Sequence, residues 1–110
     1  MQLCIPSVKG FQIVALNDII YCEGENTYTT IHLKDNKKLT ASRPLMDYEL
    51  MLLDSLFFRI HKSFLVNMKH IKEYQKGEGG VVVMSNGKIL EVSRRKKEMF
   101  IIRLKETFKY

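Results

Sequence analysis

Short runs of β-branched and aromatic residues, separated by polar turns, fill most of this sequence. The run TYTTIHL at positions 27–33 is followed by the polar turn KDNKK and then by the return run KLTAS. Such residues favour a pleated, half-buried surface, and their short spacing is typical of strands joined by hairpins. The dipeptide Asn86-Gly87 predicts a hairpin with a type I′ turn, in which both central residues have positive φ. The sequence therefore predicts small antiparallel sheets.

Two segments depart from this strand pattern. Between positions 44 and 54 the apolar spacing predicts an amphipathic helix, with Ser42 as its cap and Pro44 as an early proline. The leucines expected at helical spacing are Leu45, Leu52, Leu53 and Leu56. The tail at positions 94–110 predicts a second helix. The predicted fold class is mainly β, with small, mostly antiparallel sheets and one or two short helices.

A length of 110 residues predicts one domain at positions 1–110. Strand-like sequence begins almost at the first residue, so we expect a fragment of a longer protein whose N-terminal domain is missing. Cys4 and Cys22 lie in no metal-ligand pattern, and a buried free thiol at Cys22 fits a reducing compartment. The sequence has no signal peptide and no apolar run long enough to cross a bilayer. We expect a cytoplasmic protein whose segment makes no membrane contact.

The sequence shows no set of residues that is typical of a catalytic site. His61 and Ser63 are two positions apart, which would place them on one face of a strand, but no acid accompanies them. The phosphate-binding, dinucleotide-binding and zinc-protease motifs are also absent. We therefore predict that the protein is not an enzyme, binds no metal and needs no cofactor.

Positive charge is concentrated beside two predicted strands. The formal net charge is +6, which favours a polyanionic partner such as nucleic acid, an anionic membrane or an acidic protein. His61 and Lys62 precede the apolar run SFLVN, and positions 94–97 hold four consecutive cations. The planar fork of arginine suits guanine edges and phosphate oxygens. Other lysines are expected to be solvated surface residues: Lys37, Lys38, Lys72 and Lys109.

The loop EGENTYT is a third candidate contact. An asparagine such as Asn26 can pair with an adenine edge, or it can simply tolerate a turn conformation, and both interpretations stay open. DNA would repel Glu23 and Glu25, so these acids are expected to point elsewhere or to hold neighbouring cations.

Three blocks of the sequence resemble the LytTR family of bacterial DNA-binding domains. They are ALNDIIYCEGENTYTTIHLKDNKK, LMDYELMLLDSLFFRIHKSFLVNMKHIKEY and NGKILEVSRRKK. The resemblance covers roughly positions 10–100, and the segment FFRIHKSFLVNMKHI is highly specific to the family. The EVSRRKK segment follows at the distance the family shows, although its run of cations is longer than the family minimum.

The resemblance implies an elongated β-β-β arrangement that binds double-stranded DNA through loops inserted into successive major grooves. Family members usually act as output domains of response regulators in two-component systems, behind a receiver domain. A receiver or another sensor domain is therefore the expected partner in the parent protein. The family binds direct-repeat operators, typically as two protomers, and bends the DNA. The implied function is sequence-specific transcription regulation.

The family pattern places the DNA contacts in three segments of this sequence. The expected contact residues are Asn26, Thr27, Tyr28, His61, Lys62, Ser93, Arg94, Arg95 and Lys96. The run RIHK is interpreted as a loop anchored by Ile60, and Arg59 either pairs with an acid behind it or contacts DNA. Asn67 is expected to cap the following turn. The alternative function is a basic β-rich protein-interaction module that recognises an acidic partner.

Overall fold

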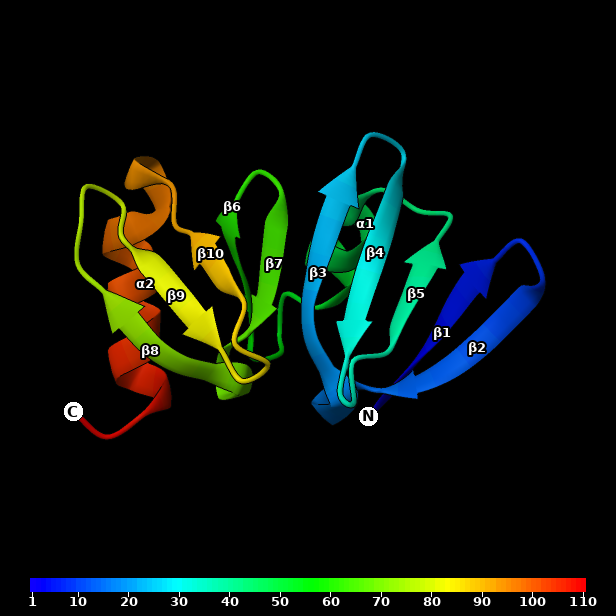
Figure 1. The fold of residues 1–110 in the computed structure, drawn as a ribbon, viewed down its shortest axis with the longest axis horizontal. Helices are drawn as coiled ribbons and strands as arrows, with labels where there is room; N and C mark the ends of the chain where they lie inside the picture. Colours follow the sequence, from blue (N-terminus) through cyan, green and yellow to red (C-terminus); the bar gives the residue numbers. More distant parts are fainter.

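The computed structural model describes residues 1–110, which form three antiparallel sheets and two α-helices (Figure 1). The molecule is elongated, with principal extents of 41 × 27 × 25 Å. This architecture confirms the predicted fold class. Neither helix is long and apolar enough to cross a membrane.

A five-stranded sheet forms the centre of the molecule. Its strands lie in the order β5 (Lys38–Ala41), β4 (Tyr28–Leu33), β3 (Ile19–Glu25), β7 (Phe64–Asn67) and β6 (Phe57–His61). All of these pairings are antiparallel. Because β3 pairs with β7 across a long sequence separation, the hairpins β3–β4 and β6–β7 lie side by side in one sheet.

Two smaller sheets flank the centre at opposite ends of the long axis (Figure 1). One is the N-terminal hairpin of β1 (Gln2–Ser7) and β2 (Gly10–Ala15). The other contains β8 (Ile71–Gln75), β9 (Val81–Met84) and β10 (Ile89–Glu91). Short 3-10 turns, η1 (Leu16–Asp18) and η2 (Met68–His70), lead into β3 and β8.

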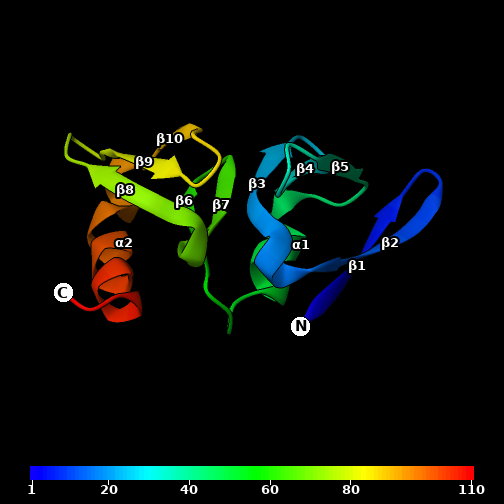
Figure 2. The same cartoon turned by 60° about the horizontal axis from the view of Figure 1, so that its bottom comes forward.

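The helices pack on the same side of the molecule, below the sheets in the view of Figure 2. α1 (Leu45–Met51) contacts β3, β6 and β7, whereas α2 (Arg94–Thr107) contacts β6.

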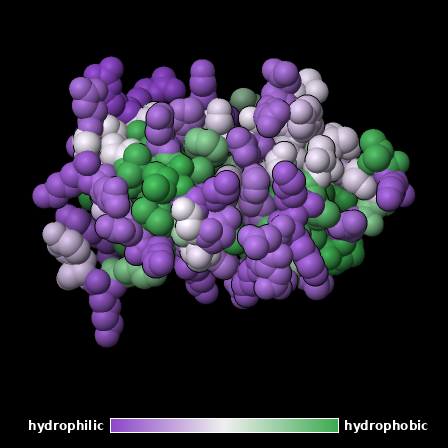
Figure 3. Space-filling view, viewed as in Figure 1, coloured by the Kyte–Doolittle hydropathy of each residue, from purple (hydrophilic) through white to green (hydrophobic).

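Hydrophobic residues are exposed on the N-terminal hairpin and on β10, including Phe11, Ile13 and Ile89. Figure 3 shows one hydrophobic patch left of the centre and others on the right of an otherwise mostly hydrophilic face.

Two hydrophobic cores meet along β7. Leu65 belongs to the core that includes Tyr48 of α1, and its neighbour Val66 belongs to the core that includes Phe100 of α2. Successive side chains of a strand point to opposite faces, so one strand can join both cores. The two residues are 1% and 0% exposed, which confirms the prediction that SFLVN contains a core strand.

The predicted limits of the first helix were partly wrong. Pro44, not Ser42, occupies the N-cap position, and no side chain caps the helix. The helix ends at Met51, so Leu53 lies beyond it and is 63% exposed, while Tyr48 supplies a buried contact that the leucine pattern missed. The second predicted helix is confirmed as α2.

Two local predictions need correction. Most of RIHK is not a loop, because β6 extends through His61 and pairs with β7, which leaves Lys62 and Ser63 as the turn. Asn86-Gly87 does not form a type I′ turn, because only Gly87 has positive φ. The Gly87 amide donates to the Met84 carbonyl, and the Lys88 amide donates to the Asn86 side chain. This hairpin therefore uses a three-residue loop with its glycine last.

Candidate nucleic-acid interface

The three predicted contact segments lie along one long side of the molecule, the upper side in Figure 1. They are the turn between β3 and β4, the turn between β6 and β7, and the first turn of α2. The Gly24 amide donates to the Ser63 carbonyl at 2.9 Å, which connects the first two segments. The Ser93 amide donates to the Ile60 carbonyl at 2.9 Å, which connects the last two.

A basic pocket of about 430 Å³ forms between the β6–β7 turn and α2. Its lining includes five of the predicted contact residues: His61, Lys62, Ser93, Arg95 and Lys96. Arg59 and Glu49 complete the lining, and no hydrophobic residue contributes to it. The pocket therefore gathers side chains that can donate hydrogen bonds to anionic oxygens.

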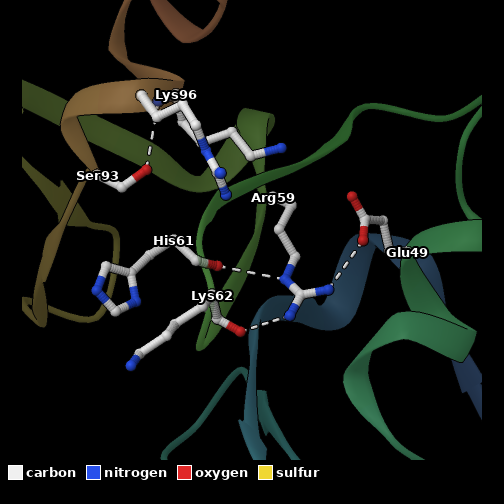
Figure 4. Close-up of a pocket in the computed structure, with 7 residues that line it drawn as sticks. Glu49, Arg59, His61, Lys62, Ser93 and Lys96 are labelled. Carbon is white, nitrogen blue, oxygen red and sulfur yellow. Dashed lines mark hydrogen bonds and ion pairs between the residues drawn. The ribbon is translucent and has the colours of Figure 1, made fainter.

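Arg59 holds the β6–β7 turn in place from behind (Figure 4). Its Nη1 donates to Glu49 Oε1 on α1 at 2.8 Å. Its Nε and Nη2 donate to the carbonyls of His61 and Lys62. One guanidinium thus joins the helix to His61 at the end of β6 and to Lys62 in the turn. This geometry confirms the interpretation in which Arg59 pairs with an acid behind the turn.

The imidazole of His61 has one nitrogen committed to the turn. Its Nδ1 accepts a hydrogen bond from the Ser63 amide at 3.1 Å. In a neutral imidazole that accepts at Nδ1, the proton is on Nε2, which is then a donor. The ring also contacts Phe64, with 5.4 Å between ring centroids. A neutral His61 therefore has Nε2 left as its donor for a ligand.

Ser93 begins α2 as its N-cap residue. Its Oγ accepts a hydrogen bond from the Lys96 amide at 3.3 Å, so the hydroxyl already has a structural role. The first turn of α2 carries Arg94, Arg95 and Lys96 and contains no acid. Cations at a helix N-terminus are unfavourable for that helix because the exposed amides there carry partial positive charge. An anion placed beside this turn would relieve the repulsion.

The two arginines of this turn have different surroundings. Arg95 lines the basic pocket, whereas Arg94 lies outside its lining and pairs with Glu78 at 3.3 Å. The pair is weak because both side chains are more than three-quarters exposed. The Lys97 ammonium donates to the Gly77 carbonyl at 3.2 Å, so the β8–β9 loop contacts the start of α2. Arg95 is the better placed of the two for a shared ligand with His61.

The β3–β4 turn is shorter than the sequence predicted. Glu25 and Tyr28 form the last pair of the ladder, which leaves only Asn26 and Thr27 in the turn. Asn26 has φ of 53°, and asparagine tolerates this left-handed conformation better than most residues do. The turn interpretation of Asn26 is therefore confirmed, and a contact with DNA stays a prediction. None of Asn26, Thr27 and Tyr28 lines the basic pocket.

The acids near this turn are occupied within the molecule. The Tyr28 hydroxyl donates to Glu25 at 2.9 Å, and this hydrogen bond raises the pKa of Tyr28. Glu23 lies 3.2 Å from Nε2 of His32, whose ring stacks on Tyr21. The pKa of His32 is lowered, chiefly by burial, while the contact with Glu23 acts in the opposite direction. Both acids contact neighbouring side chains, but neither contact is with a lysine or arginine, and their orientation relative to DNA stays a prediction.

Glu49 is the lining residue that the sequence did not suggest. It lies on α1, and only the tertiary structure brings that helix beside β6. Its carboxylate is 30% exposed and is neutralised by Arg59. An isolated acid in an amphipathic helix carries no sequence signal for such a role. The predicted structural alternative for Arg59 was the only indication that an acid had to be present.

The fold described above agrees with the fold of a similar solved structure, and a family model also matches the chain. A family model described as the LytTr DNA-binding domain matches residues 9–105. The chain is also similar to a solved LytTr DNA-binding domain from Bacillus cereus, with a TM-score of 0.80 and 25% sequence identity. That match covers 94% of this chain and 95% of the other.

Curated relatives are longer than this chain. It is 39% identical over 79 residues to the transcriptional regulatory protein LytR of Staphylococcus aureus, covering 70% of this chain and 32% of the relative. It is 37% identical over 95 residues to the sensory transduction protein LytT of Bacillus subtilis, covering 84% and 39%. The chain thus spans about a third of the length of these relatives.

Proposed function

The chain belongs to the LytTR family of DNA-binding domains, and from that premise we propose that it binds double-stranded DNA in a sequence-specific manner and has no catalytic activity. The single observation that carries this proposal is the shared pocket of His61, Lys62, Arg95 and Lys96. Donors from two elements line this pocket on one side of the molecule. A phosphate or a guanine edge has the acceptors that such donors require.

The proposed mechanism gives the three segments separate tasks. The pocket side chains enter one major groove, where Arg95 contacts a guanine edge or a phosphate. Asn26, Thr27 and Tyr28 lie outside the pocket and are proposed to reach a neighbouring groove. Phosphate contacts fix the position of the domain on DNA, whereas contacts to base edges supply sequence preference.

The arrangement of the parent protein is also a proposal. Similarity to transcriptional and sensory regulators supports an output role in a response regulator, with a receiver or another sensor domain elsewhere in the parent. We propose that two protomers occupy direct repeats and bend the DNA between them. The cytoplasmic location expected from the sequence stays a prediction.

Selection of duplexes from a random library tests the proposed function. The 110-residue chain is used as bait, with washes at about 150 mM salt because non-specific phosphate binding weakens steeply with salt. We expect a recurring motif, repeated at multiples of about 10 bp if paired protomers contact one face of the duplex. Uniform binding without a motif would contradict sequence-specific recognition.

Matched variants separate the pocket from general charge. Lys62→Ala with Arg95→Ala removes two cations from the pocket, and Lys37→Ala with Lys38→Ala removes two cations near the β4–β5 turn. We expect the first pair to abolish the motif and the second to preserve it. Equal losses in both would show that net charge, not the pocket, attracts the DNA.

A further inference from the structure

A second concavity, larger than the basic pocket, lies between β8 and the C-terminal part of α2. It has a volume of about 700 Å³. Its apolar walls come from Ile71 and Tyr74 on β8 and from Ile101 and Leu104 on α2, all of which also pack against the second core. This β8–α2 groove has a size typical of ligand-binding clefts.

Exposed aromatic side chains extend the groove past the end of α2. Phe108 is 43% exposed and Tyr110 is 95% exposed, and both line the groove. Large apolar groups that gather beside a cleft, rather than singly over a surface, mark a place where another molecule is bound. The groove therefore offers an apolar floor that the fold itself leaves uncovered.

Lysines dominate the rim of this groove. They are Lys72, Lys76, Lys97, Lys105 and Lys109, against Glu73 as the only acid in the lining. None of the five ammonium groups forms an ion pair within the molecule. The Lys105 ammonium lies instead over the Tyr110 ring, 4.1 Å from its centroid. The sequence pattern treated Lys72 and Lys109 as separate surface residues, and the fold brings them to one rim.

We propose that the β8–α2 groove binds an acidic amphipathic segment of a partner protein. Apolar side chains of that segment would cover Ile71, Ile101 and Leu104, and its carboxylates would neutralise the lysine rim. An apolar centre with a polar, charged rim is the usual composition of a protein interface. A helix with one apolar stripe and acidic flanks fits such a groove.

The groove suits a protein partner better than DNA. A DNA backbone presents phosphates and sugars, which need cations and gain little from an apolar floor. The C-terminal end of α2 also lies on the side opposite the β3–β4 and β6–β7 turns (Figure 1). A partner in the groove could therefore be bound while those turns face DNA. The proposal does not depend on DNA binding.

Titration of the isotope-labelled chain with three synthetic peptides tests this proposal. Each peptide has about 16 residues, long enough to form a short helix. The first has a stripe of Leu and Phe flanked by Glu, the second has Gln for every Glu, and the third keeps Glu but has Ser in the stripe. Amide chemical shifts report both the affinity and the location of binding.

We expect the first peptide to shift amides of β8 and of residues 97–110, and the other two to bind at least about tenfold more weakly. Lys72→Glu with Lys105→Glu, one residue from each wall, should reduce binding by a similar factor. The control Lys37→Glu with Lys38→Glu makes the same change in net charge and should bind as the wild type does. These lysines are exposed, and the amide spectrum of each variant verifies that it folds.

Several outcomes would overturn the proposal. Equal binding of the three peptides, or equal losses in the two double variants, would mean non-specific attraction to a basic surface. Shifts centred on His61 and Arg95 would place the peptide in the basic pocket. DNA binding could also depend less on salt in Lys72→Glu with Lys105→Glu than in the wild type, with no such change in the control variant. That result would identify the groove as a DNA contact. If the wild-type chain self-associates and Lys72→Glu with Lys105→Glu abolishes that association, the occupant of the groove is a second copy of the chain.

Discussion

Glu49 on α1 and Arg59 on β6 form an ion pair of 2.8 Å directly behind the end of the β6–β7 hairpin, where His61 and Lys62 lie. The same guanidinium donates to the carbonyls of His61 and Lys62. The sequence pattern assigned no DNA contact to α1. Through Arg59, this helix nevertheless determines the position of two proposed contact residues. Groups held in place before binding lose less conformational freedom when the ligand arrives.

Glu49→Gln distinguishes positioning from charge. The substitution makes the domain more basic, so charge alone would strengthen DNA binding. We expect weaker binding instead, because the Arg59 fork loses its anchor. A partly exposed ion pair contributes about 1 kcal/mol, which corresponds to about a fivefold rise in Kd. The measurement is fluorescence anisotropy with a duplex from the selection, and tighter binding by Glu49→Gln would contradict the positioning role.

Arg95→Ala should weaken DNA binding more than Arg94→Ala does. Arg95 lines the basic pocket, whereas Arg94 pairs with Glu78 outside it. If Arg95 contacts a base, its loss costs about 1–3 kcal/mol on the preferred duplex and relaxes preference at one position. If it contacts a phosphate, all duplexes weaken alike and the salt slope falls by about 1. Competition binding at several salt concentrations measures both, and a larger effect from Arg94→Ala would refute the ranking.

Two substitutions at Asn26 separate its two interpretations. Glycine accepts the φ of 53° without strain, whereas alanine costs about 1 kcal/mol in the left-handed region. We expect Asn26→Gly to keep the urea midpoint of the wild type and Asn26→Ala to lower it. We also expect Asn26→Gly to bind DNA more weakly, because the amide is absent. Wild-type affinity in this variant would show that Asn26 serves the turn alone.

Gly79→Ala should destabilise the domain strongly. A Cβ at this position would lie 1.8 Å from the Val92 carbonyl oxygen, a backbone atom immediately before α2. Such overpacking costs about 1–3 kcal/mol, and more where the backbone cannot shift. The matched control is Gly77→Ala, because its Cβ would meet only ordinary contacts. Urea unfolding of both variants tests this, and equal midpoints would show that the β8–β9 loop adjusts freely.

Alkaline pH should destabilise the fold through its buried thiol. Burial raises the pKa of Cys22 from 9.0 to about 12, so the folded state favours the neutral form. The resulting stability is fully present below pH 9 and is lost as the pH rises towards 12. The pKa values of Tyr21 and Tyr48 also rise to about 12 and add a loss of the same sign. The urea midpoint should fall less steeply with pH in Cys22→Ala.

Thiol labelling provides an independent measurement of Cys22. Cys4 is exposed and Cys22 is buried, so at pH 8 we expect one thiol to react quickly with an aromatic disulfide and the second only after unfolding. The variant Cys4→Ser serves as the control, since it should be inert when folded. Rapid labelling of this variant would contradict the burial of Cys22.

Local pattern was enough to identify most of the strands. β-branched and aromatic runs such as 27–33 became β4, and the turn residues between runs became hairpins. The type of the Asn86-Gly87 turn was predicted wrongly, because the Asn86 side chain stabilises a different loop by accepting from the Lys88 amide. The end of the first helix was also predicted wrongly, since the helix ends at Met51 and leaves Leu53 outside it. Both errors concern ends of elements, where side-chain hydrogen bonds and tertiary packing compete with propensity.

The sequence by itself determined the sheet content, the family and the three segments that carry the proposed contacts. Those features depend on residue type and short-range spacing, which a linear chain already contains. Only the tertiary structure decided which contacts share a pocket, that Glu49 anchors the Arg59 fork, and that scattered lysines such as Lys72 and Lys105 form one rim. These relationships join residues far apart in the chain, and they arise only when β3 pairs with β7 and the helices pack against the sheets.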